Sequence, residues 1–538
     1  MASSSARPDG AARARRARGR SAKLVLLACA AFFGCQPAQT PPSSTGPMAS
    51  AAPVSQSRCM VAAARLVRAA RRPIQIDLYV TRGRDLETLG RDVETLLTQL
   101  AGVSGGRMTI ASHAVTTTDT HTEAARDGLT LQSFVGAGGA EEGAPRGYFG
   151  IVVRYGGRTR SVDLQPRAPT GIAYWTLSAL QSLTSIVDGV SKRIGVLTGH
   201  GEIGLFEANL APYTMGAFSV QGVMIDNFPY YQFVEVNLKR GERAVDPSLE
   251  GLIITQPAED LNDAELRLID RFVTSGKSLA VFAGAANVAP SDSSMTAHLA
   301  RHGLEKLLDG YGIELRHDVL LDFARSFWVE VEGTSGRKDA LRLPQIPFAE
   351  DDDSTGRARA VRDDFQPTFA LPRVAVPMAS SIVLHPEKQP DARPMVVLRT
   401  TMRARRVGDE QVDLSPWHDW GSGGELGQFA VAAYLQGHVR PAFPSGENAL
   451  ENETARSRVF VVSSSQFLTN PFARAGNPPV SATGRPVPTE EQRRLLSIAG
   501  TYAKERITDV LLLVKNTLDW MVGYDELLPC RTETIGGK

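Results

Sequence analysis

The chain has 538 residues, of which 42% are hydrophobic and 22% are charged, and its formal net charge is +1. This length exceeds what a single hydrophobic core normally serves, so we expect two or three folded domains. The composition is ordinary for a globular protein, and the near-neutral charge excludes the strongly basic field typical of nucleic-acid-binding proteins.

The first 34 residues have the pattern of a secretory signal peptide. A basic segment, residues 12–23, precedes the apolar run 24–35, which ends in Phe-Phe-Gly-Cys35. A spanning helix needs ~20 apolar residues, so we expect an export signal rather than a transmembrane helix. The ending resembles a bacterial lipoprotein cleavage box and predicts lipidation of Cys35. A simple cleaved signal and a short uncleaved anchor are the alternatives.

A flexible tether is expected at residues 35–72, because the Pro/Ser/Ala-rich stretch after Cys35 cannot bury a core. The first 34 residues hold seven Lys or Arg and one Asp, which leaves 52 basic and 57 acidic residues and a formal charge of −5. The mature protein should therefore be mildly acidic, which again argues against nucleic acid as a partner.

The first folded domain is expected at residues 73–188. Alternating and amphipathic patterns predict elements in the order βαβ-α-ββ-α, which is the order of a thioredoxin-like domain. A Gly156-Gly157 pair predicts the tight turn of a hairpin. The expected elements are a strand at 73–80, a helix at 86–100, a strand at 107–115, a short helix at 122–129, a hairpin at 148–164 and a helix at 172–187.

The second domain is expected at residues 189–531. Strands are predicted at 193–199 and 230–238, followed by a β-α-β unit at 251–284. Within that unit, Asn262 and Glu265 form a capping box at the start of the helix, and Gly276 suits the position just after its end. Such alternation predicts a doubly wound parallel sheet of the flavodoxin or amidotransferase-like kind, with a C-terminal extension.

The rest of this domain is less regular in sequence. Residues 333–368 are polar and charged, which predicts an exposed insertion. Residues 427–437 fit either a helix or an amphipathic strand, and 507–523 predict a final amphipathic helix. Tryptophans of both domains are expected to pack in cores: Trp175, Trp328 and Trp520.

Only four cysteines occur, at positions 29, 35, 59 and 530. Their absence from residues 60–529 excludes a thiol nucleophile, a CxxC redox pair and a thiolate metal site in the folded domains. A thioredoxin-like scaffold would therefore lack redox chemistry. Cys59 and Cys530 can pair in an oxidising compartment, but the sequence leaves this open.

Several motifs in chain order resemble the GldG-type auxiliary proteins of ABC transport systems, the gliding-motility-associated family. The resemblance spans roughly residues 73–531 and implies an extracytoplasmic protein held at a membrane beside ABC permease and ATPase subunits, with direct contact to the permease. The motifs are GVLTGHGE, LIITQPAEDLNDAELRLIDRFVTSGKSLAVF, GLEKLLDGYGIELRHDVLLD, VPMASSIVL, LQGHVRPAF, RVFVVSSSQFLTN and LLLVKNTLDWMVG.

Two features depart from that family pattern. Such proteins often carry a transmembrane helix after the last amphipathic helix, and here residues 524–538 show none, so an N-terminal anchor or a soluble periplasmic form is expected. A segment that usually reads Gly-Asp-Ser-Asp-Phe is Ser-Ser-Ser-Gln-Phe at 463–467. The missing acids weaken any metal-binding role there.

The turn Gly199-His200-Gly201-Glu202 is the most conspicuous candidate site. It lacks both the Lys-Ser/Thr of a P-loop and the spacing of a GxGxxG loop, and two potential ligands do not make a zinc site. An acid–base pair here would still need a nucleophile. These four residues are therefore expected to form a structural corner first, a ligand- or partner-binding site second and a catalytic site last.

Two further patterns are weaker. His298 and His302 lie four residues apart, but without the glutamate of an HExxH motif they predict a solvated helical face. Ser464 follows a predicted strand without a G-x-S-x-G motif, so a hydrogen-bonded turn is expected.

Taken together, the sequence predicts a non-enzymatic, membrane-associated auxiliary component of an ABC-type transport system on the periplasmic side of a bacterial envelope. No cofactor and no metal are expected, and the choice between inner and outer membrane stays open. One alternative is a divergent hydrolase that uses His200, Glu202 and Ser464. Another is a periplasmic module that binds a small glycan or anion in a strand-end pocket at 199–202.

Overall fold

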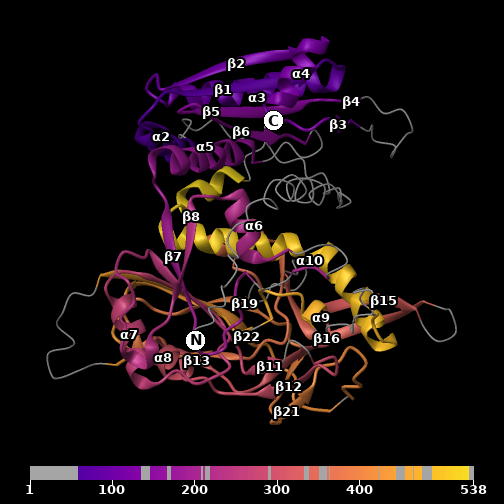
Figure 1. The fold of residues 1–538 in the computed structure, drawn as a ribbon. Coiled ribbons are helices and arrows are strands. Elements are labelled where there is room, and N and C mark those ends of the chain that lie inside the picture. Colours follow the sequence, from indigo (N-terminus) through magenta and orange to yellow (C-terminus); the bar gives the residue numbers. More distant parts are fainter. Residues whose placement is uncertain are drawn as a thin grey trace, which may run out of the picture. The chain divides into compact units, whose positions relative to one another are not determined.

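The computed structural model describes residues 58–531 with short gaps, so the predicted signal peptide, Cys29, Cys35 and most of the tether lie outside the described residues. The chain forms two compact units (Figure 1). Unit 1 comprises Met1–Val190, Asp226–Pro229 and Pro529–Lys538, and unit 2 comprises Ser191–Ile225 and Tyr230–Leu528. The gaps are 135–145, 166–170, 207–209, 213–217, 289–291, 333–337, 351–359, 363, 422, 444–454, 465 and 475–486.

Unit 1 is built on a four-stranded sheet of order β2-β1-β5-β6, in which β1 is parallel to β2 and antiparallel to β5. The main elements follow the order that the sequence predicts, after one additional N-terminal helix. Gly156 and Gly157 form the tight turn between β5 and β6, both with positive φ. The elements are α2 (Arg58–Ala69), β1 (Ile74–Thr81), α3 (Arg84–Gly102), β2 (Met108–Val115), α4 (Thr118–Arg126), β3 (Gln132–Ser133), β4 (Arg146–Gly147), β5 (Phe149–Tyr155), β6 (Arg158–Asp163) and α5 (Ile172–Asp188).

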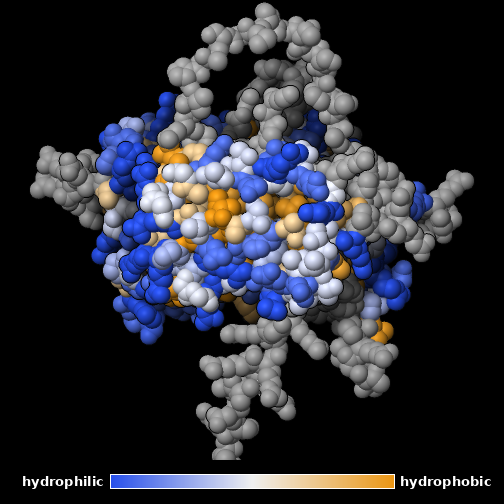
Figure 2. All heavy atoms as spheres, turned by 90° about the horizontal axis from the view of Figure 1, so that it is seen from above, coloured by the Kyte–Doolittle hydropathy of each residue, from blue (hydrophilic) through white to orange (hydrophobic). Residues whose placement is uncertain are grey.

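One face of this sheet carries a buried carboxylate, Asp77 on β1. Arg154 on β5 donates hydrogen bonds to Asp77 and to Asp127 at the end of α4, and His113 on β2 lies 3.4 Å from Asp77. Burial alone would raise the pKa of Asp77, but the hydrogen bonds from Arg154 and Gln75 and the charge of Arg154 bring it below its ordinary value. Figure 2 looks onto the β2 and α4 side of unit 1, where hydrophobic residues gather near the centre and hydrophilic residues surround them.

The main sheet of unit 2 has nine strands in the order β13-β18-β22-β23-β10-β9-β7-β8, with β19 also paired to β22. The α/β fold class is confirmed. The sheet is parallel from β8 to β23, as predicted, whereas β22, β18, β19 and β13 pair in antiparallel fashion. Its strands are β7 (Lys192–Leu197), β8 (Tyr231–Val236), β9 (Gly251–Thr255), β10 (Ser278–Phe282), β13 (Ile313–Leu315), β18 (Ile382–Leu384), β19 (Met395–Arg399), β22 (Ala430–His438) and β23 (Arg456–Val462).

Helices cover both faces of the parallel part, which explains its continuous apolar strands. On one face, α7 (Asp263–Thr274) and α8 (Leu304–Gly310) bury leucine, isoleucine and phenylalanine side chains against alternate strand residues. On the other face lies α10 (Glu490–Val522), where Ser278 donates a 2.8 Å hydrogen bond to the carbonyl of Met521. The predicted capping box of α7 is confirmed, since Asn262 accepts from the backbone N–H groups of Ala264 and Glu265.

Smaller sheets and short helices complete unit 2. The sheets are β11-β12-β21, β14-β20 and β15-β16-β17. Their bounds, with the remaining helices, are β11 (Ala286–Val288), β12 (Thr296–Leu299), β14 (Val319–Asp322), β15 (Ser326–Glu332), β16 (Lys338–Glu350), β17 (Arg373–Ala375), β20 (Ala404–Val407), β21 (Gln411–Asp413), α6 (Val220–Asn227), α9 (Pro471–Arg474), η2 (Lys239–Gly241), η3 (Gln366–Thr368), η4 (Pro386–Lys388) and η5 (Asp525–Arg531).

Two sequence predictions about this region are wrong. The segment 333–368 is not simply an exposed insertion, because β16 runs through it and residues 343–349 are buried in a core beneath α10. Trp328 is not a core residue: it is 55% exposed, while Phe327 and Val329 on either side of it are buried. The strand period of two explains Trp328, since only alternate residues of an amphipathic strand face the core, whereas residues 343–349 are buried without a break.

The final helix is longer than its apolar pattern predicts. It begins at a second capping box, in which Thr489 and Gln492 satisfy one another's backbone N–H groups, and it ends at Gly523 with positive φ. The predicted apolar residues of its second half are buried: Val510, Leu513, Val514, Leu518 and Met521. Among the helices in the described residues, none has the length and apolar character to cross a membrane.

Candidate functional site

The Gly-His-Gly-Glu turn follows β7 at the carboxyl end of the parallel strands. Gly199 and Gly201 both have positive φ, of 116° and 71°. A side chain at either position would also collide, since a Cβ on Gly199 would lie 2.7 Å from Asn237 and one on Gly201 would lie 2.9 Å from Ala258. The local fold therefore demands glycine at both positions.

These two glycines turn His200 inward, between two carboxylates. Its Nδ1 lies 3.2 Å from Glu202, and its Nε2 lies 3.0 and 3.1 Å from the two carboxylate oxygens of Glu265. Glu202 also accepts the backbone N–H of His200, and Glu265 accepts that of Asn262. Each ring nitrogen of His200 therefore faces a carboxylate oxygen within hydrogen-bonding distance.

This cluster joins three elements of unit 2. The carbonyl of His200 accepts the backbone N–H groups of Ala258 and Glu259 after β9, and Glu265 belongs to the capping box of α7. The side chains of His200 and Glu202 are 2% and 3% exposed, so a ligand reaches neither without opening the corner. In the sheet β7 lies between β8 and β9, so the chain changes direction of winding next to it. Doubly wound sheets usually bind ligands at the carboxyl end of such a strand, but here protein side chains occupy that position.

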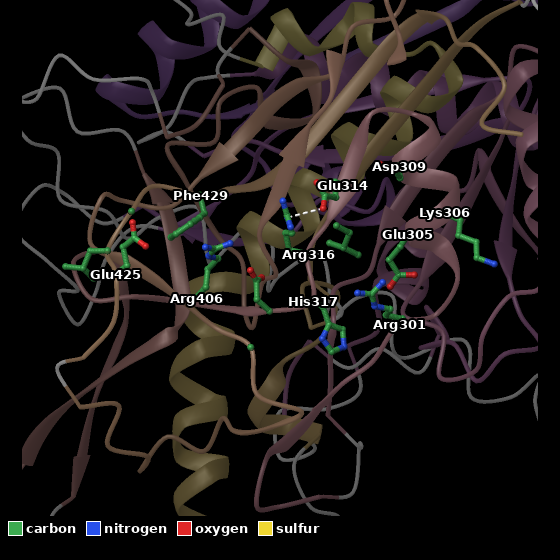
Figure 3. A pocket seen from close by; sticks show the side chains of 15 residues that line it. Arg301, Glu305, Lys306, Asp309, Glu314, Arg316, His317, Arg406, Glu425 and Phe429 are labelled. Carbon is green, nitrogen blue, oxygen red and sulfur yellow. Dashed lines mark ion pairs between the residues drawn. The ribbon is translucent and has the colours of Figure 1, made fainter. Parts of the chain in front are cut away.

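A groove of about 810 Å³ lies elsewhere in unit 2 (Figure 3). One wall comes from α8 and the loop before it, the floor from the end of β13, and the other wall from β20 and the segment before β22. Its lining is predominantly charged and consists of Arg301, Glu305, Lys306, Asp309, Glu314, Leu315, Arg316, His317, Asp318, Arg406, Gly408, Glu425, Leu426, Gly427 and Phe429.

Most acids of the groove already have a hydrogen-bond or ion-pair partner within the protein. Glu314 lies 3.1 Å from Arg316 and 2.9 Å from His385, and Asp318 accepts two hydrogen bonds from Ser381. Asp309 pairs with Lys388 in the same way, at 2.6 Å.

Two arginines of the groove remain available. Among the described residues, no carboxylate lies within ion-pair distance of Arg301 or Arg406, and Arg406 stands over the ring of Phe429 at 5.5 Å. Figure 3 shows them on opposite walls, with His317 between them. Two guanidinium groups without carboxylate partners can hold a small anion.

The family of the chain follows from its sequence match to a known protein family. The family model described as "ABC-type uncharacterized transport system" matches residues 191–493, which is more than half of the chain. The chain belongs to this family. The match begins at the start of unit 2 and includes both the His200 corner and the groove, so it gives a transport-associated auxiliary role to the part of the chain that carries them.

Other comparisons add little to the family assignment. No curated protein matches the chain. A solved structure, "mmIFT52 N-terminal domain", is 11% identical and covers 51% of this chain and 86% of that chain, with a TM-score of 0.28. A likeness at that level carries no argument about fold or function.

The remaining sequence candidates of this ABC-transport family member occupy structural positions. Ser463 donates hydrogen bonds to the carbonyls of Ser380 and Val431, and Ser464 donates to the carbonyl of Pro377, in agreement with a hydrogen-bonded turn. Ser465 lies outside the described residues. Within the described part of the chain, no cluster of three or more His, Cys, Asp or Glu side chains is arranged to hold a metal ion.

The prediction of a helical His298–His302 face is wrong. His298 lies on β12 and is exposed, whereas His302 lies in the following turn and is buried, with its Nε2 3.2 Å from the carbonyl of Gly284. A strand and a turn replace the expected helix, so the two rings do not share a face.

The structure also settles a question that the sequence leaves open. Cys59 on α2 and Cys530 in η5 form a disulfide, and both are fully buried in unit 1. They are separated by 471 residues, so the bond ties the two ends of the described chain together within one unit.

The groove could not be predicted from the sequence, because its lining residues belong to separate segments between residues 301 and 429. A signal was present, since the motif GLEKLLDGYGIELRHDVLLD supplies eight of the lining residues: Glu305, Lys306, Asp309, Glu314, Leu315, Arg316, His317 and Asp318. A dense run of charges after a short predicted strand suggests an exposed strand end. Only the fold brings Arg406 and Phe429 to the opposite wall.

Proposed function

We propose that this protein is a membrane-associated, non-enzymatic auxiliary component of an ABC-type transport system, of the GldG type, that contacts the permease on the periplasmic side of a bacterial envelope. The observation that carries the proposal is the family match over residues 191–493. The motifs that resemble GldG-type proteins support the finer assignment. Most of unit 1 lies outside the match, and we propose that it is a thioredoxin-like module without redox cysteines.

The disulfide supports an extracytoplasmic location. Disulfides persist in the oxidising bacterial periplasm and are rare in the reducing cytosol. Cys59 and Cys530 are paired and buried, and the N-terminal segment has the pattern of an export signal. Both observations favour export of the chain, with Cys35 as the site of lipid attachment.

The arrangement of the candidate catalytic side chains supports a non-enzymatic role. His200 and Glu202 are buried and engaged with each other and with Glu265, and the hydroxyl of Ser464 is committed to a backbone carbonyl. A hydrolase needs its base within reach of both nucleophile and substrate. The geometry therefore gives the hydrolase alternative no support.

Co-purification tests the transport role. The tagged, full-length protein is isolated from membranes in mild detergent, and its partners are identified by mass spectrometry. We expect an ABC permease and an ATPase subunit to be recovered with it, and to be lost when the membranes are washed in a harsh detergent. Recovery of neither subunit, from membranes that retain the protein itself, contradicts the proposal.

Intact mass tests the anchor separately. The mature protein should begin at Cys35 and carry acyl chains, and the Cys35→Ala variant should lose both the added mass and the membrane fraction. A mature chain that begins elsewhere, without lipid mass, removes the lipoprotein proposal and leaves the transport role to the co-purification result.

A second candidate function is binding of a small anion, and the two unpaired arginines of the groove favour it. This moves the predicted ligand site away from residues 199–202, where the side chains are buried. A thermal-shift screen with phosphate, sulfate and sugar acids tests it. We expect stabilisation that is lost when Arg301 and Arg406 are both changed to Ala, whereas a flat response contradicts it.

A further inference from the structure

The β15–β16 hairpin of unit 2 presents a row of exposed side chains on its outer face. Trp328 and Glu330 project outward from β15, and Lys338, Ala340 and Arg342 project outward from β16. Trp328 stands directly opposite Arg342 in the register, and Lys338 lies 3.3 Å from Glu330. The hairpin therefore combines an aromatic ring and a guanidinium with an ion pair at its side.

The inner face of the same hairpin is rigidly held. Phe327 and Val329 are buried, and the ring of Phe327 packs edge-on against Tyr502 of α10, with centroids 5.3 Å apart. A well-packed inner row holds the backbone of the strand in place and keeps Trp328 on its outer face. Exposed Trp beside Arg is the composition of interface hot spots, where buried Trp and Arg supply most of the binding energy.

β15 is also an edge strand. In the sheet β15-β16-β17 it pairs with β16 on one side, and within the described ranges no strand pairs with its other side. Its unpaired backbone groups are a template for one more strand. In Figure 1 the hairpin extends from unit 2 beside α9 and the first turns of α10.

We propose that β15 is a docking strand that binds an extended segment of a partner protein by strand addition. The partner segment places basic residues along the outer face, one beside Glu330 and one over the ring of Trp328, while its alternate residues continue the apolar inner row. If the partner is a subunit of the transport system, that identity rests on the proposed function, whereas the binding by strand addition does not.

Charge decides between a partner and a second copy of this chain. The sequence of β15, SFWVEVE, contains two acidic residues and no basic one. Lys338 and Arg342 belong to β16, one strand further from the free edge, so a second β15 would pair its two acidic residues with a strand that carries two of its own, and like charges across paired strands are destabilising. A partner strand with lysine or arginine at alternate positions would instead bring positive charges to the acidic residues of β15. The charge of β15 therefore favours a basic partner segment over a second copy of this chain.

Synthetic peptides test the proposal directly. A fluorescein-labelled peptide of sequence KVKVKVK is titrated with the mature chain, and binding is followed by anisotropy, with EVEVEVE as the control peptide. We expect the basic peptide to bind at least about tenfold more tightly than the acidic one. We also expect Trp328→Ser to weaken binding at least about tenfold, and Trp328→Phe to weaken it less.

A matched pair of charge reversals isolates the strand edge. Glu330 and Glu259 are exposed to a similar degree, at 55% and 61%, and each forms one surface ion pair. Glu330→Lys should abolish the preference for the basic peptide, whereas Glu259→Lys should leave it unchanged. Circular dichroism checks that each variant is folded.

Three results would overturn the proposal. They are equal binding of the two peptides, unchanged binding by Trp328→Ser, and an equal effect of the two charge reversals. Analytical ultracentrifugation tests the other occupant. A concentration-dependent dimer that is lost in Trp328→Ser would show that a second copy of this chain occupies the free edge of β15. If neither peptide preference nor peptide binding is found while the permease still co-purifies, the docking-strand proposal is wrong and the transport role stands. If the basic peptide binds as expected but no permease co-purifies, the docking strand stands and the transport role is wrong.

Discussion

In unit 1 the buried carboxylate of Asp77 meets a guanidinium that is 30% exposed, whereas in unit 2 the His200 ring and both of its carboxylate partners are at most 3% exposed. The same kind of ionic cluster thus lies on a partly open sheet face in one unit and inside a strand-end corner in the other. Water can solvate Arg154 if its partner is lost, but it cannot reach Glu265. The difference teaches that burial of the partners, more than their charge, sets the cost of breaking a cluster.

Removing the histidine should have the largest effect. His200→Ala removes the imidazole that both buried carboxylates face and leaves their charges uncompensated by any side chain of the cluster, so we expect a loss of about 3–5 kcal/mol in the free energy of unfolding. Urea unfolding followed by tryptophan fluorescence measures it, since four of the five tryptophans lie in unit 2. The control is His418→Ala, a histidine that is 35% exposed and pairs with Asp413 at the surface. Equal losses in the two variants would refute the buried-cluster interpretation.

Loss of the disulfide should act on unit 1 with a somewhat smaller effect. Replacing Cys59 and Cys530 together by Ser should cost about 2–4 kcal/mol, because the unfolded chain regains the freedom of a very long loop. Hydrogen exchange by mass spectrometry should show faster exchange in α2 and η5, with the parallel strands of unit 2 unchanged. Uniformly faster exchange in both units would show that the bond does not act on unit 1 alone.

Breaking the partly exposed cluster should cost less. Asp77→Asn removes the charge that Arg154 and His113 face, and we expect a loss of about 2 kcal/mol at pH 7. The pKa of Asp77 is lowered from its ordinary value of 3.8. The stabilisation is therefore complete above that value and is lost as the pH falls through the lower folded pKa. Urea midpoints of both proteins, compared at pH 7 and at a series of pH values descending from 3.8, should converge step by step; a constant difference contradicts this.

The smallest effect is expected at the docking strand. Trp328→Ser should change the free energy of unfolding by less than about 0.5 kcal/mol, because the ring is more than half exposed and its neighbours hold the hairpin. Phe327→Ser, one residue away, is the matched contrast and should cost about 3 kcal/mol or more, because it buries a hydroxyl and empties a core position. Thermal unfolding of both variants measures the two effects, and similar losses would mean that Trp328 is a packing residue after all.

Local signals predicted a good part of the fold. The capping box of Asn262 and Glu265, the Gly156-Gly157 turn and the apolar face of the last helix depend on residues close in sequence, and the structure confirms each of them. The α/β class follows from alternating strands and helices, which is also a local pattern.

Predictions failed where burial depends on distant segments. The pair His298 and His302 has helical spacing, yet the strand pairing of β12 with β11 and β21 overrides it. Trp328 has the composition of a core residue, but the register of β15 against β16 turns it outward. The groove was missed for the same reason, because its two walls come from segments about a hundred residues apart.

The sequence by itself determined the α/β class, the absence of thiols from residues 60–529, the capping box of α7 and the motifs that resemble ABC transport auxiliary proteins. Only the tertiary structure decided that His200 is enclosed by Glu202 and Glu265, that Cys59 and Cys530 pair, and that Arg301 and Arg406 face one groove. The reason is physical: propensities, caps and periods act over a few residues, whereas enclosure of a charge depends on which remote side chains the fold brings within a few ångströms of it.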